Sequence, residues 1–290
     1  MKLLVLGADG MLGHQLVASL RDSHDIHGTL RQQSEAYATM AHFLPDYPHF
    51  GIDVRDYAPV RDLLELLEPD AVINAVGVVK QRPDAGNAIL SLEVNSLLPH
   101  RLAETCAAIG SFLVQISTDC AFSGMGGNYR EDDFPDARDL YGRSKLLGEV
   151  DAPGSITFRT SIIGLELYRK TSLVEWFLAQ RGTVKGFRRA IYSGFTTMEM
   201  ARIIEHVLVK QQSQNGGMYH VSSDPIDKFT LLCMLNDRLG RATAIVPDDE
   251  FECDRSLDSE RFRSEFAYSP PTWARMLDEL ATQIEERYPC

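Results

Sequence analysis

Tyr141 and Lys145 stand four positions apart in the stretch YGRSK. On a helix this spacing puts both side chains on one face. A free phenol has a pKa of about 10, and a neighbouring ammonium lowers that pKa by stabilising the phenolate. The pair could therefore give a proton to the alkoxide that forms when hydride adds to a ketone. The same spacing also occurs on plain helix surfaces, so the function of the pair depends on what lies upstream.

A hydroxyl follows the strand that should lie next to this helix. SFLVQIS (111–117) is predicted to be a buried strand, and Thr118 comes directly after it. In open parallel sheets, ligands bind at the carboxyl ends of the strands. Thr118 could there hydrogen-bond the substrate oxygen and help to hold it. We predict Thr118, Tyr141 and Lys145 as the catalytic residues.

A second chemical pattern, GxxGxxG, lies between the predicted strand KLLVLG (2–7) and the predicted helix MLGHQLVASL (11–20). Gly7 permits a tight turn, Gly10 lets the backbone approach a pyrophosphate, and Gly13 lets the helix pack closely on the sheet. The first N–H groups of the helix would face the phosphates. The pattern predicts a bound dinucleotide, and the alternative is a glycine-rich turn in an α/β fold that binds no nucleotide.

The end of the second predicted strand, DIHGTLR (25–31), bears on the choice between NAD and NADP. A carboxylate there would hold the ribose 2′-hydroxyl, whereas an arginine accommodates a 2′-phosphate. The strand ends in Arg31 with no acidic residue, which favours NADPH. Asp9 argues for NADH, because its carboxylate would lie near that phosphate. A solvated arginine is the other interpretation of Arg31.

Two further strand ends fit a dinucleotide. Asp53 and Val54 close the run FGIDV, where a third strand should end, and a carboxylate there could accept the adenine amino group. Small residues close the fourth strand and leave room for a ribose. The predicted cofactor-binding residues are Gly7, Asp9, Gly10, Met11, Leu12, Gly13, Arg31, Asp53, Val54, Ala75, Val76, Gly77, Asn95, Tyr141 and Lys145.

These residues need a scaffold, and the alternation of strand and helix patterns supplies one. Apolar strand runs at 71–77, 111–117 and 155–164 alternate with helical spacing at 57–70, 92–110 and 140–151. Such alternation predicts an α/β fold with a Rossmann-type, doubly wound parallel sheet. The second part is less regular, with predicted helices at 172–182, 197–211, 228–240 and 272–287 and a strand at 217–223. We expect residues 1–164 to bind NAD(P) and residues 165–290 to form a smaller α/β part that mainly binds substrate, with segments at about 190–225 returning to the Rossmann core.

Composition limits the partners. The chain has 290 residues, is 44% hydrophobic and carries a net charge of −12. This acidic balance disfavours nucleic acid and anionic membrane surfaces, although a helix N-terminus can still attract a small anion. No apolar run approaches the roughly 20 residues of a membrane span, so we expect a cytoplasmic protein. The five scattered cysteines and eight scattered histidines predict neither disulfides nor a metal site. The oligomeric state stays open, with a homodimer as one arrangement.

The segment STDCAFSGMGGNYREDDFPDARDLYGRSKLLGE (117–149) gives a specific resemblance. It resembles the extended short-chain dehydrogenase/reductase family and, within it, the dTDP-4-dehydrorhamnose reductase group. The positions that match functional residues of the family are Gly7, Gly10, Gly13, Thr118, Tyr141 and Lys145. The resemblance implies NAD(P)H-dependent reduction of the 4-keto group of a nucleotide-diphospho-6-deoxysugar, for deoxysugar and cell-surface polysaccharide biosynthesis. Tyr141 would give the proton.

The resemblance also implies where the substrate binds. The predicted substrate-binding residues are Thr118, Asp119, Cys120, Trp176 and Arg255, and further candidates for the nucleotide diphosphate are Arg159, Lys185 and Arg188. Arg255 opens RSLDSERFR, which resembles a late family segment. Each candidate could equally be a surface or packing residue. Cys120 and Ser123 stand where the group usually has tyrosine and aspartate, which leaves the particular sugar open.

Three other functions compete with a reductase. A dehydratase of the family places Asp-Glu after the threonine, whereas here Asp119 is followed by Cys120. An epimerase uses the same three catalytic residues, retains its cofactor and returns the hydride to the other face. Some proteins that resemble these reductases are regulatory, dinucleotide-binding subunits of another enzyme. Such subunits can lose the Tyr/Lys pair, which this chain keeps.

Overall fold

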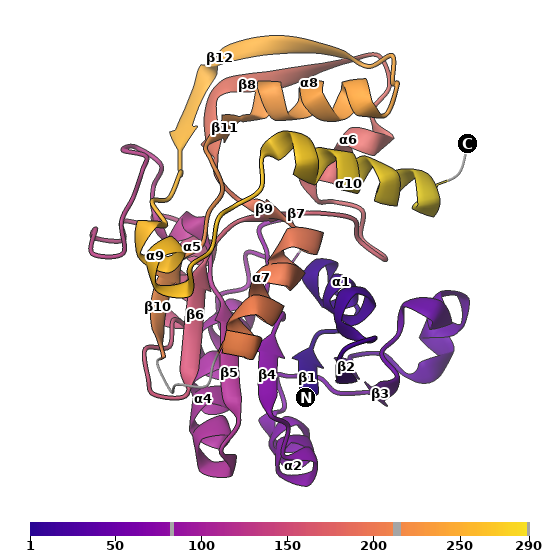
Figure 1. Ribbon diagram of the computed structural model, residues 1–290, viewed down its shortest axis with the longest axis vertical. Helices are drawn as coiled ribbons and strands as arrows, with labels where there is room; N and C mark the ends of the chain where they lie inside the picture. Colours follow the sequence, from indigo (N-terminus) through magenta and orange to yellow (C-terminus); the bar gives the residue numbers. More distant parts are fainter. Residues whose placement is uncertain (82–83, 211–215, 289–290) are drawn as a thin grey trace. The chain divides into compact units, whose positions relative to one another are not determined.

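The computed structural model describes residues 1–81, 84–210 and 216–288. The chain, drawn in Figure 1, divides into two compact units, each assembled from three stretches of sequence. Unit 1 comprises Met1–Thr118, Arg138–Arg159 and Ala201–Tyr219, and unit 2 comprises Asp119–Ala137, Thr160–Met200 and His220–Cys290. The assignment of dinucleotide binding to residues 1–164 and of substrate binding mainly to 165–290 stays a prediction.

Unit 1 is built on a seven-stranded sheet with the order β3-β2-β1-β4-β5-β6-β10. Its strands are β1 (Lys2–Leu6), β2 (Asp25–Leu30), β3 (Tyr47–Phe50), β4 (Ala71–Asn74), β5 (Phe112–Ile116), β6 (Ser155–Arg159) and β10 (Gly217–His220). The pairings from β3 through to β6 are all parallel. The strand order reverses between β1 and β4, and this is where such sheets bind ligands. The predicted Rossmann-type fold is confirmed.

Both faces of the sheet are covered. Leu4 and Leu6 of β1 pack in one cluster with residues of α2 (Tyr57–Leu67) and α4 (Leu98–Ile109). The alternate residues Leu3 and Val5, which point to the other face, are also 0% exposed. This double coverage explains why the strands are continuous apolar runs rather than alternating ones. The other helices of unit 1 are α1 (Met11–Leu20), η1 (Ser34–Phe43), α3 (Ala88–Ser91), η2 (Leu92–Leu97) and α5 (Leu140–Leu147).

The helix ends follow local chemistry. Asp56 caps α2, where its carboxylate accepts a hydrogen bond from the Ala58 N–H at 3.2 Å. Helix α2 ends at Glu68, which is left-handed with φ 43° and precedes Pro69. Helix α4 has a proline in its first turn and ends at Gly110, with φ 74°. These signals fix where the chain turns back toward the sheet.

Three predicted elements differ from the observed ones. The third strand ends at Phe50 rather than at Asp53 and Val54, because Gly51 turns the chain with φ 73°. The predicted strand 155–164 is two strands, since β6 ends at Arg159 and β7 (Ile162–Ile163) belongs to another sheet. The helix predicted from residue 92 begins as the π-helix η2, which leads into α4.

Unit 2 contains two small sheets. In the larger one, β8 (Thr183–Tyr192) pairs with β11 (Ile226–Asp227) antiparallel and with β12 (Ala244–Asp254) parallel. Helix α8 (Lys228–Arg238) packs on β8, and α10 (Trp273–Arg287) packs on α8. The second sheet pairs β7 with β9 (Phe195–Thr196). The remaining helices are η3 (Asp119–Ala121), α6 (Leu173–Ala179) and α9 (Glu260–Phe266), while α7 (Thr197–Lys210) starts in unit 2 and ends in unit 1.

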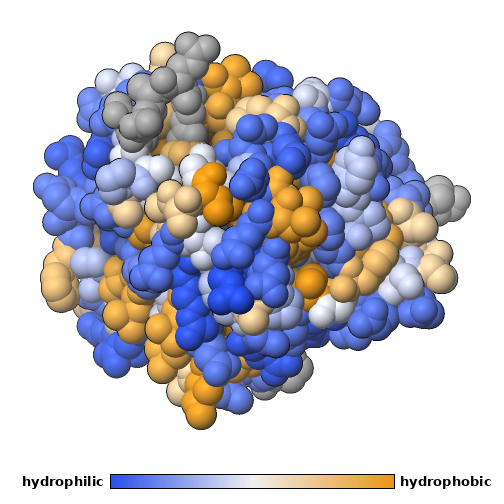
Figure 2. Space-filling model, turned by 90° about the horizontal axis from the view of Figure 1, so that it is seen from below, coloured by the Kyte–Doolittle hydropathy of each residue, from blue (hydrophilic) through white to orange (hydrophobic). Residues whose placement is uncertain are grey.

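The surface is mostly hydrophilic on the face drawn in Figure 2, with hydrophobic residues interspersed. Leu66, Ile89 and Leu147 of unit 1 are 80%, 71% and 60% exposed. Scattered apolar residues of this kind are normal on proteins in water. Within the described part of the chain, no helix is both long and apolar enough to cross a bilayer.

Candidate active site

The glycine turn after β1 has the geometry that a pyrophosphate needs. Gly7 is left-handed with φ 76°, and its carbonyl accepts a hydrogen bond from the Gly10 N–H at 2.9 Å. A Cβ at Gly13 would lie 2.0 Å from that same carbonyl oxygen, so only glycine lets α1 approach this closely. Gly10 is the N-cap of α1, and no side chain caps it. The first-turn N–H groups are therefore available to phosphate oxygens.

The turn lies against the end of β4. A Cβ at Gly7 would meet the Val76 side chain at 2.9 Å, and one at Gly10 would lie 3.9 Å from the Ala75 carbonyl oxygen. The residues Ala75, Val76 and Gly77 thus lie beside the phosphate turn, at the point where the strand order reverses. The chain's residues fit a dinucleotide here, with its pyrophosphate against Gly10–Gly13 and a ribose beside the small residues after β4.

Asp9 is tied to the end of β2 through a buried phenol. The Tyr37 hydroxyl donates to the Asp9 carboxylate at 2.9 Å and accepts from the Gln32 N–H at 3.2 Å. Tyr37 is 1% exposed, so this bridge is fixed by packing. Arg31 is exposed directly after β2. The carboxylate and the guanidinium therefore stand at the ends of β1 and β2, where the adenosine ribose of a dinucleotide would lie.

Asp53 is engaged within its own loop. Its carboxylate accepts hydrogen bonds from the Arg55 backbone and guanidinium, the latter at 2.5 to 3.0 Å. These bonds hold the pKa of the Asp53 carboxyl below its ordinary value. The Asp53 side chain is 30% exposed and ionised, so it can still accept another donor. Contact between adenine and Asp53 or Val54 stays a prediction.

The three predicted catalytic residues belong to unit 1, with Thr118 just after β5 and with Tyr141 and Lys145 on α5. Tyr141 and Lys145 lie one turn apart on α5, which Asp139 caps by accepting from the Gly142 N–H at 2.9 Å. The Lys145 ammonium donates to the Ile116 carbonyl at 2.5 Å, two residues before Thr118. Lys145 and Thr118 are only 6% and 5% exposed. Burial lowers the Lys145 pKa to about 8, and the Glu149 carboxylate partly opposes this.

Asn95, which we predicted to contact the cofactor, holds the helix in place. Its amide bonds the Val78 N–H and carbonyl at 2.9 and 3.0 Å and donates to the Ser144 hydroxyl at 3.0 Å. Asn95 is 1% exposed and lies in the π-helix η2, a form often found at functional sites. Direct contact between Asn95 and a cofactor stays a prediction, while its hydrogen bonds fix α5 against the segment after β4.

Two charged side chains near the predicted catalytic residues were not predicted from the sequence. The Lys80 ammonium lies 5.6 Å from the centre of the Tyr141 ring and pairs with Asp139 at 2.7 Å. Glu149, four residues after Lys145, pairs with Arg159 at 2.7 Å. The spacing from Lys145 to Glu149 could have indicated the second group. Nothing in the sequence pattern indicated that Lys80 would lie over the tyrosine ring.

The predicted substrate-binding residues other than Thr118 lie in unit 2. Asp119 and Cys120 form η3 directly after Thr118, and Asp119 is 8% exposed. Trp176 is 39% exposed on α6, so it is not a core residue. The Arg255 guanidinium donates to the carbonyls of Phe122 and Ser123, which fixes the loop after η3. Their contact with a substrate stays a prediction.

The other basic candidates already have carboxylate partners. Arg159 in β6 has a side chain only 4% exposed and pairs with Glu149, so the structure does not support it as a phosphate ligand. Lys185 pairs with Asp248 at 2.7 Å, and Arg188 pairs with Asp249. The Arg188–Asp249 pair is exposed on the β8–β12 sheet, where such pairs contribute little to stability, whereas Asp248 of the other pair is buried.

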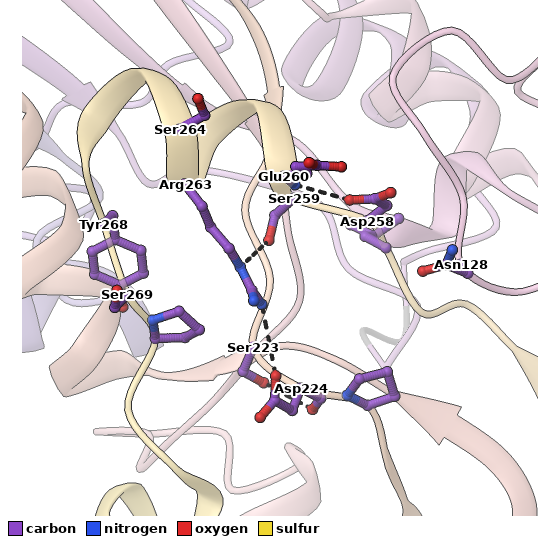
Figure 3. A pocket seen from close by; sticks show the side chains of 13 residues that line it. Asn128, Ser223, Asp224, Asp258, Ser259, Glu260, Arg263, Ser264, Tyr268 and Ser269 are labelled. Atoms are coloured by element: carbon purple, nitrogen blue, oxygen red, sulfur yellow. Dashed lines mark hydrogen bonds and ion pairs between the residues drawn. The ribbon is translucent and has the colours of Figure 1, made fainter.

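A polar pocket of about 560 Å³ lies within unit 2 (Figure 3). Its lining includes Asp224, Asp258, Ser259 and Tyr268. Arg263 projects into it from α9, donates to the Ser259 hydroxyl at 3.0 Å and lies 3.9 Å from the Asp224 carboxylate. The RSLDSERFR segment therefore shapes this pocket, although Arg255 is not among its lining residues.

Comparison with protein families places the chain. Residues 1–286 match the family described as RmlD substrate binding domain. The chain belongs to this family. The resemblance inferred from the Thr118, Tyr141 and Lys145 segment is thereby confirmed, and it extends over nearly the whole chain rather than weakening after residue 165.

Relatives of different function match the chain about equally well. Methionine adenosyltransferase 2 subunit beta of Rattus norvegicus is 30% identical over 154 residues, 51% of this chain and 41% of that protein. The dTDP-4-dehydrorhamnose reductase of Streptomyces griseus is 33% identical over 147 residues, 50% of this chain and 43% of that protein. The matched region thus spans less than half the length of either relative.

Among solved structures, dTDP-4-dehydrorhamnose reductase from Bacillus anthracis in complex with NADP has a TM-score of 0.79. It is 20% identical to this chain and covers 98% of it, with 99% of its own length aligned. The similarity at this identity establishes that the two chains share a fold.

Proposed function

We propose that this protein is an NAD(P)H-dependent reductase that converts the 4-keto group of a nucleotide-diphospho-6-deoxysugar to an alcohol. The observation that carries the proposal is the Lys145–Ile116 hydrogen bond, because it holds α5 at the end of the strand that leads to Thr118. Family membership and the match to a dTDP-4-dehydrorhamnose reductase support the same substrate class. The reaction would serve deoxysugar and cell-surface polysaccharide biosynthesis, in the cytoplasm.

The side chains have complementary roles. A bound dinucleotide supplies the hydride that reduces the ketone. Thr118 donates a hydrogen bond to the substrate oxygen and holds it beside α5. Tyr141 gives its phenolic proton to the alkoxide, and the Lys145 ammonium stabilises the phenolate that remains. Because Lys145 is 6% exposed, its charge is poorly screened by solvent.

NADPH is the cofactor that we propose, with NADH as the alternative. Exposed Arg31 can pair with a 2′-phosphate, and an arginine matches phosphate geometry. Asp9 opposes this preference, but its carboxylate already accepts the Tyr37 hydroxyl. We expect Arg31→Ala to weaken NADPH binding at least tenfold and NADH binding less than twofold, measured by nicotinamide fluorescence. An unchanged ratio of the two dissociation constants would place the 2′-phosphate elsewhere.

A regulatory dinucleotide-binding subunit is the second candidate. The match to methionine adenosyltransferase 2 subunit beta favours it, at about the same identity as the match to the reductase. The retained Tyr141 and Lys145, held at the end of β5, favour catalysis. An epimerase would use the same residues without net consumption of reduced cofactor.

One assay separates the three functions. The purified protein is mixed with NADPH and a dTDP-4-keto-6-deoxysugar, and absorbance at 340 nm is followed. A reductase consumes NADPH steadily. An epimerase inverts a carbon centre of the sugar without net consumption of NADPH, and a regulatory subunit binds NADPH with no turnover. Gel filtration of the same sample would test the homodimer.

The matched variant is Tyr141→Phe, which keeps the ring and removes the transferable proton. We expect its turnover to fall by about 10²–10⁴ while NADPH binding stays within twofold. Thr118→Val should lower turnover as well, because it removes the hydroxyl but keeps the shape. Full activity of Tyr141→Phe would refute the assigned role.

A further inference from the structure

Beneath the catalytic helix lies a buried ion pair that the proposed mechanism does not use. The Arg159 guanidinium donates to both Glu149 oxygens, at 2.8 and 2.7 Å. The two side chains are 4% and 11% exposed. Burying two charges is costly, and hydrophobic residues of the same volume often give equal or greater stability. The Arg159–Glu149 pair therefore points to a role other than stability.

The pair is connected to both sides of the catalytic centre. The Ser117 hydroxyl donates to Glu149 at 2.7 Å, and Ser117 directly precedes Thr118. On the other side, Glu149 follows α5 and lies four residues after Lys145, whose ammonium is bound to the Ile116 carbonyl. One carboxylate thus joins the end of β5, the end of β6 and the catalytic helix.

We propose that Glu149 is a positioning residue for the reduction, which fixes the strand end carrying Thr118 and provides the counter-charge for the Lys145 ammonium, while Arg159 orients it. This inference rests on the proposed function for its catalytic meaning. The ammonium makes one backbone hydrogen bond in a site that is almost closed to water. A negative charge nearby raises the pKa of such a group and favours its protonated form.

Other charged groups near α5 are directed elsewhere. Glu93 of η2 interacts with Arg55, and Lys80 pairs with Asp139 at the start of α5. His100 of α4 lies 2.8 Å from the Leu147 carbonyl, at the last turn of the helix. Within the described part of the chain, Glu149 is the charged group that raises the pKa of Lys145 against the lowering caused by burial.

The test reads the Lys145 titration directly. Protein labelled with ¹⁵N at the lysine side chains is titrated by NMR, and the Lys145 signal is assigned by its loss in Lys145→Met. We expect a midpoint near 8 in the natural protein. Glu149→Gln keeps the shape and removes the charge, so the midpoint should fall by about one unit or more. Glu65→Gln, on the exposed face of α2, is the matched control and should change nothing.

Two further variants guard against misfolding. Breaking a buried pair from one side leaves an uncompensated buried charge, which can destabilise the fold strongly. The double variant Glu149→Gln with Arg159→Gln leaves no unpaired charge. Its midpoint should also fall, but by less than in the single variant, because the positive charge of Arg159 is removed as well. Ser117→Ala keeps the charge but releases the strand end, so it should lower turnover several-fold with the midpoint still near 8.

Kinetics provides the second readout. The alkaline pH at which kcat/KM declines should move down with the Lys145 midpoint in both Glu149 variants. A midpoint that stays near 8 in Glu149→Gln and in the double variant would overturn the inference. The titration needs no substrate. A protein that never consumes NADPH would therefore refute the proposed function, and the effect of Glu149 on the Lys145 midpoint could still be measured.

Discussion

At the scale of single residues, the site is defined by a lysine that is expensive to bury. Lys145 is 6% exposed, and burial is the main cause of its low pKa of about 8. Its ordinary pKa is 10.5, so below pH 8 the folded state holds an ammonium that water would solvate better. In the proposed mechanism the phenol of Tyr141 requires a charged lysine, which gives this cost a function.

The cost of burying the Lys145 ammonium predicts that replacing this lysine with an apolar residue makes the protein more stable. A pKa lowered from 10.5 to about 8 corresponds to roughly 3 kcal/mol at neutral pH. Lys145→Met removes that cost but leaves the Ile116 carbonyl without its donor, a loss of about 1 kcal/mol. We expect a net gain of about 1–2 kcal/mol at pH 7, measured by urea denaturation.

The pH dependence of the unfolding free energy provides the control for the Lys145→Met variant. Between pH 8 and 10.5 the unfolded chain keeps the Lys145 proton and the folded chain loses it. The contribution of Lys145 to stability therefore rises with pH in this window. The advantage of Lys145→Met should shrink across the window and vanish above it. A variant that is less stable than the natural protein at pH 7 would contradict the assigned burial cost.

At the scale of elements, close packing decides which glycines matter. Gly13 in α1 lies so near the Gly7 carbonyl that an added Cβ would sit 2.0 Å from the oxygen. Gly86 is glycine in the same unit with nothing within 4 Å of the corresponding position and no left-handed backbone. Both residues are glycines, but only at Gly13 does the surrounding backbone exclude a side chain.

This contrast predicts the effect of a single methyl group. We expect Gly13→Ala to push α1 away from the turn, weaken NADPH binding at least a hundredfold and destabilise the protein by about 1–3 kcal/mol. Gly86→Ala should change neither quantity by more than about 0.5 kcal/mol. Isothermal titration with NADPH and thermal denaturation check both. Equal binding by the two variants would show that the turn does not hold the pyrophosphate.

The parallel sheet was predictable because its strands are buried on both faces. LLVL in β1 and AVI in β4 are uninterrupted apolar runs with turns after them. β8 and β12 were missed because most of their residues are exposed or half-buried, and β12 contains a proline and many carboxylates. These two strands are stabilised by pairing with each other across a long stretch of sequence, which no local pattern reveals.

The site was predictable to the extent that it consists of short motifs. Thr118, Tyr141 and Lys145 were predicted as catalytic because strand-end and helix-face rules apply to each one locally, and their catalytic roles stay a prediction. The Ser117–Glu149–Arg159 network was missed, since it joins two strand ends and a helix end through side-chain geometry. The pairing of Arg159 with Glu149 was missed for the same reason, because the sequence does not show which charge a buried arginine faces.

At the scale of the whole molecule, the net charge opposes binding of the proposed ligands. The chain carries −12, while NADPH and nucleotide sugars are anions. The Debye length shrinks from about 30 Å at 0.01 M salt to about 8 Å at 0.15 M. Salt therefore screens the long-range repulsion, while the short contacts at the phosphate turn are less affected.

We expect the association rate constant for NADPH to rise about two- to threefold between these salt concentrations. Stopped-flow fluorescence measures it, and potassium chloride should be compared with sodium chloride to exclude an ion-specific effect. A steady decrease over the same range would mean that local positive charge, rather than the net charge, dominates the approach.

The interleaving of the two units has a consequence for how such a protein can be divided or recombined. Three stretches of each unit alternate along the chain, so the backbone passes from one to the other five times. No single cut yields a self-contained half, and a fragment ending at residue 164 would lack the β10 edge of its own sheet. Exchanging one unit between two such proteins would therefore require five coordinated junctions rather than a single one.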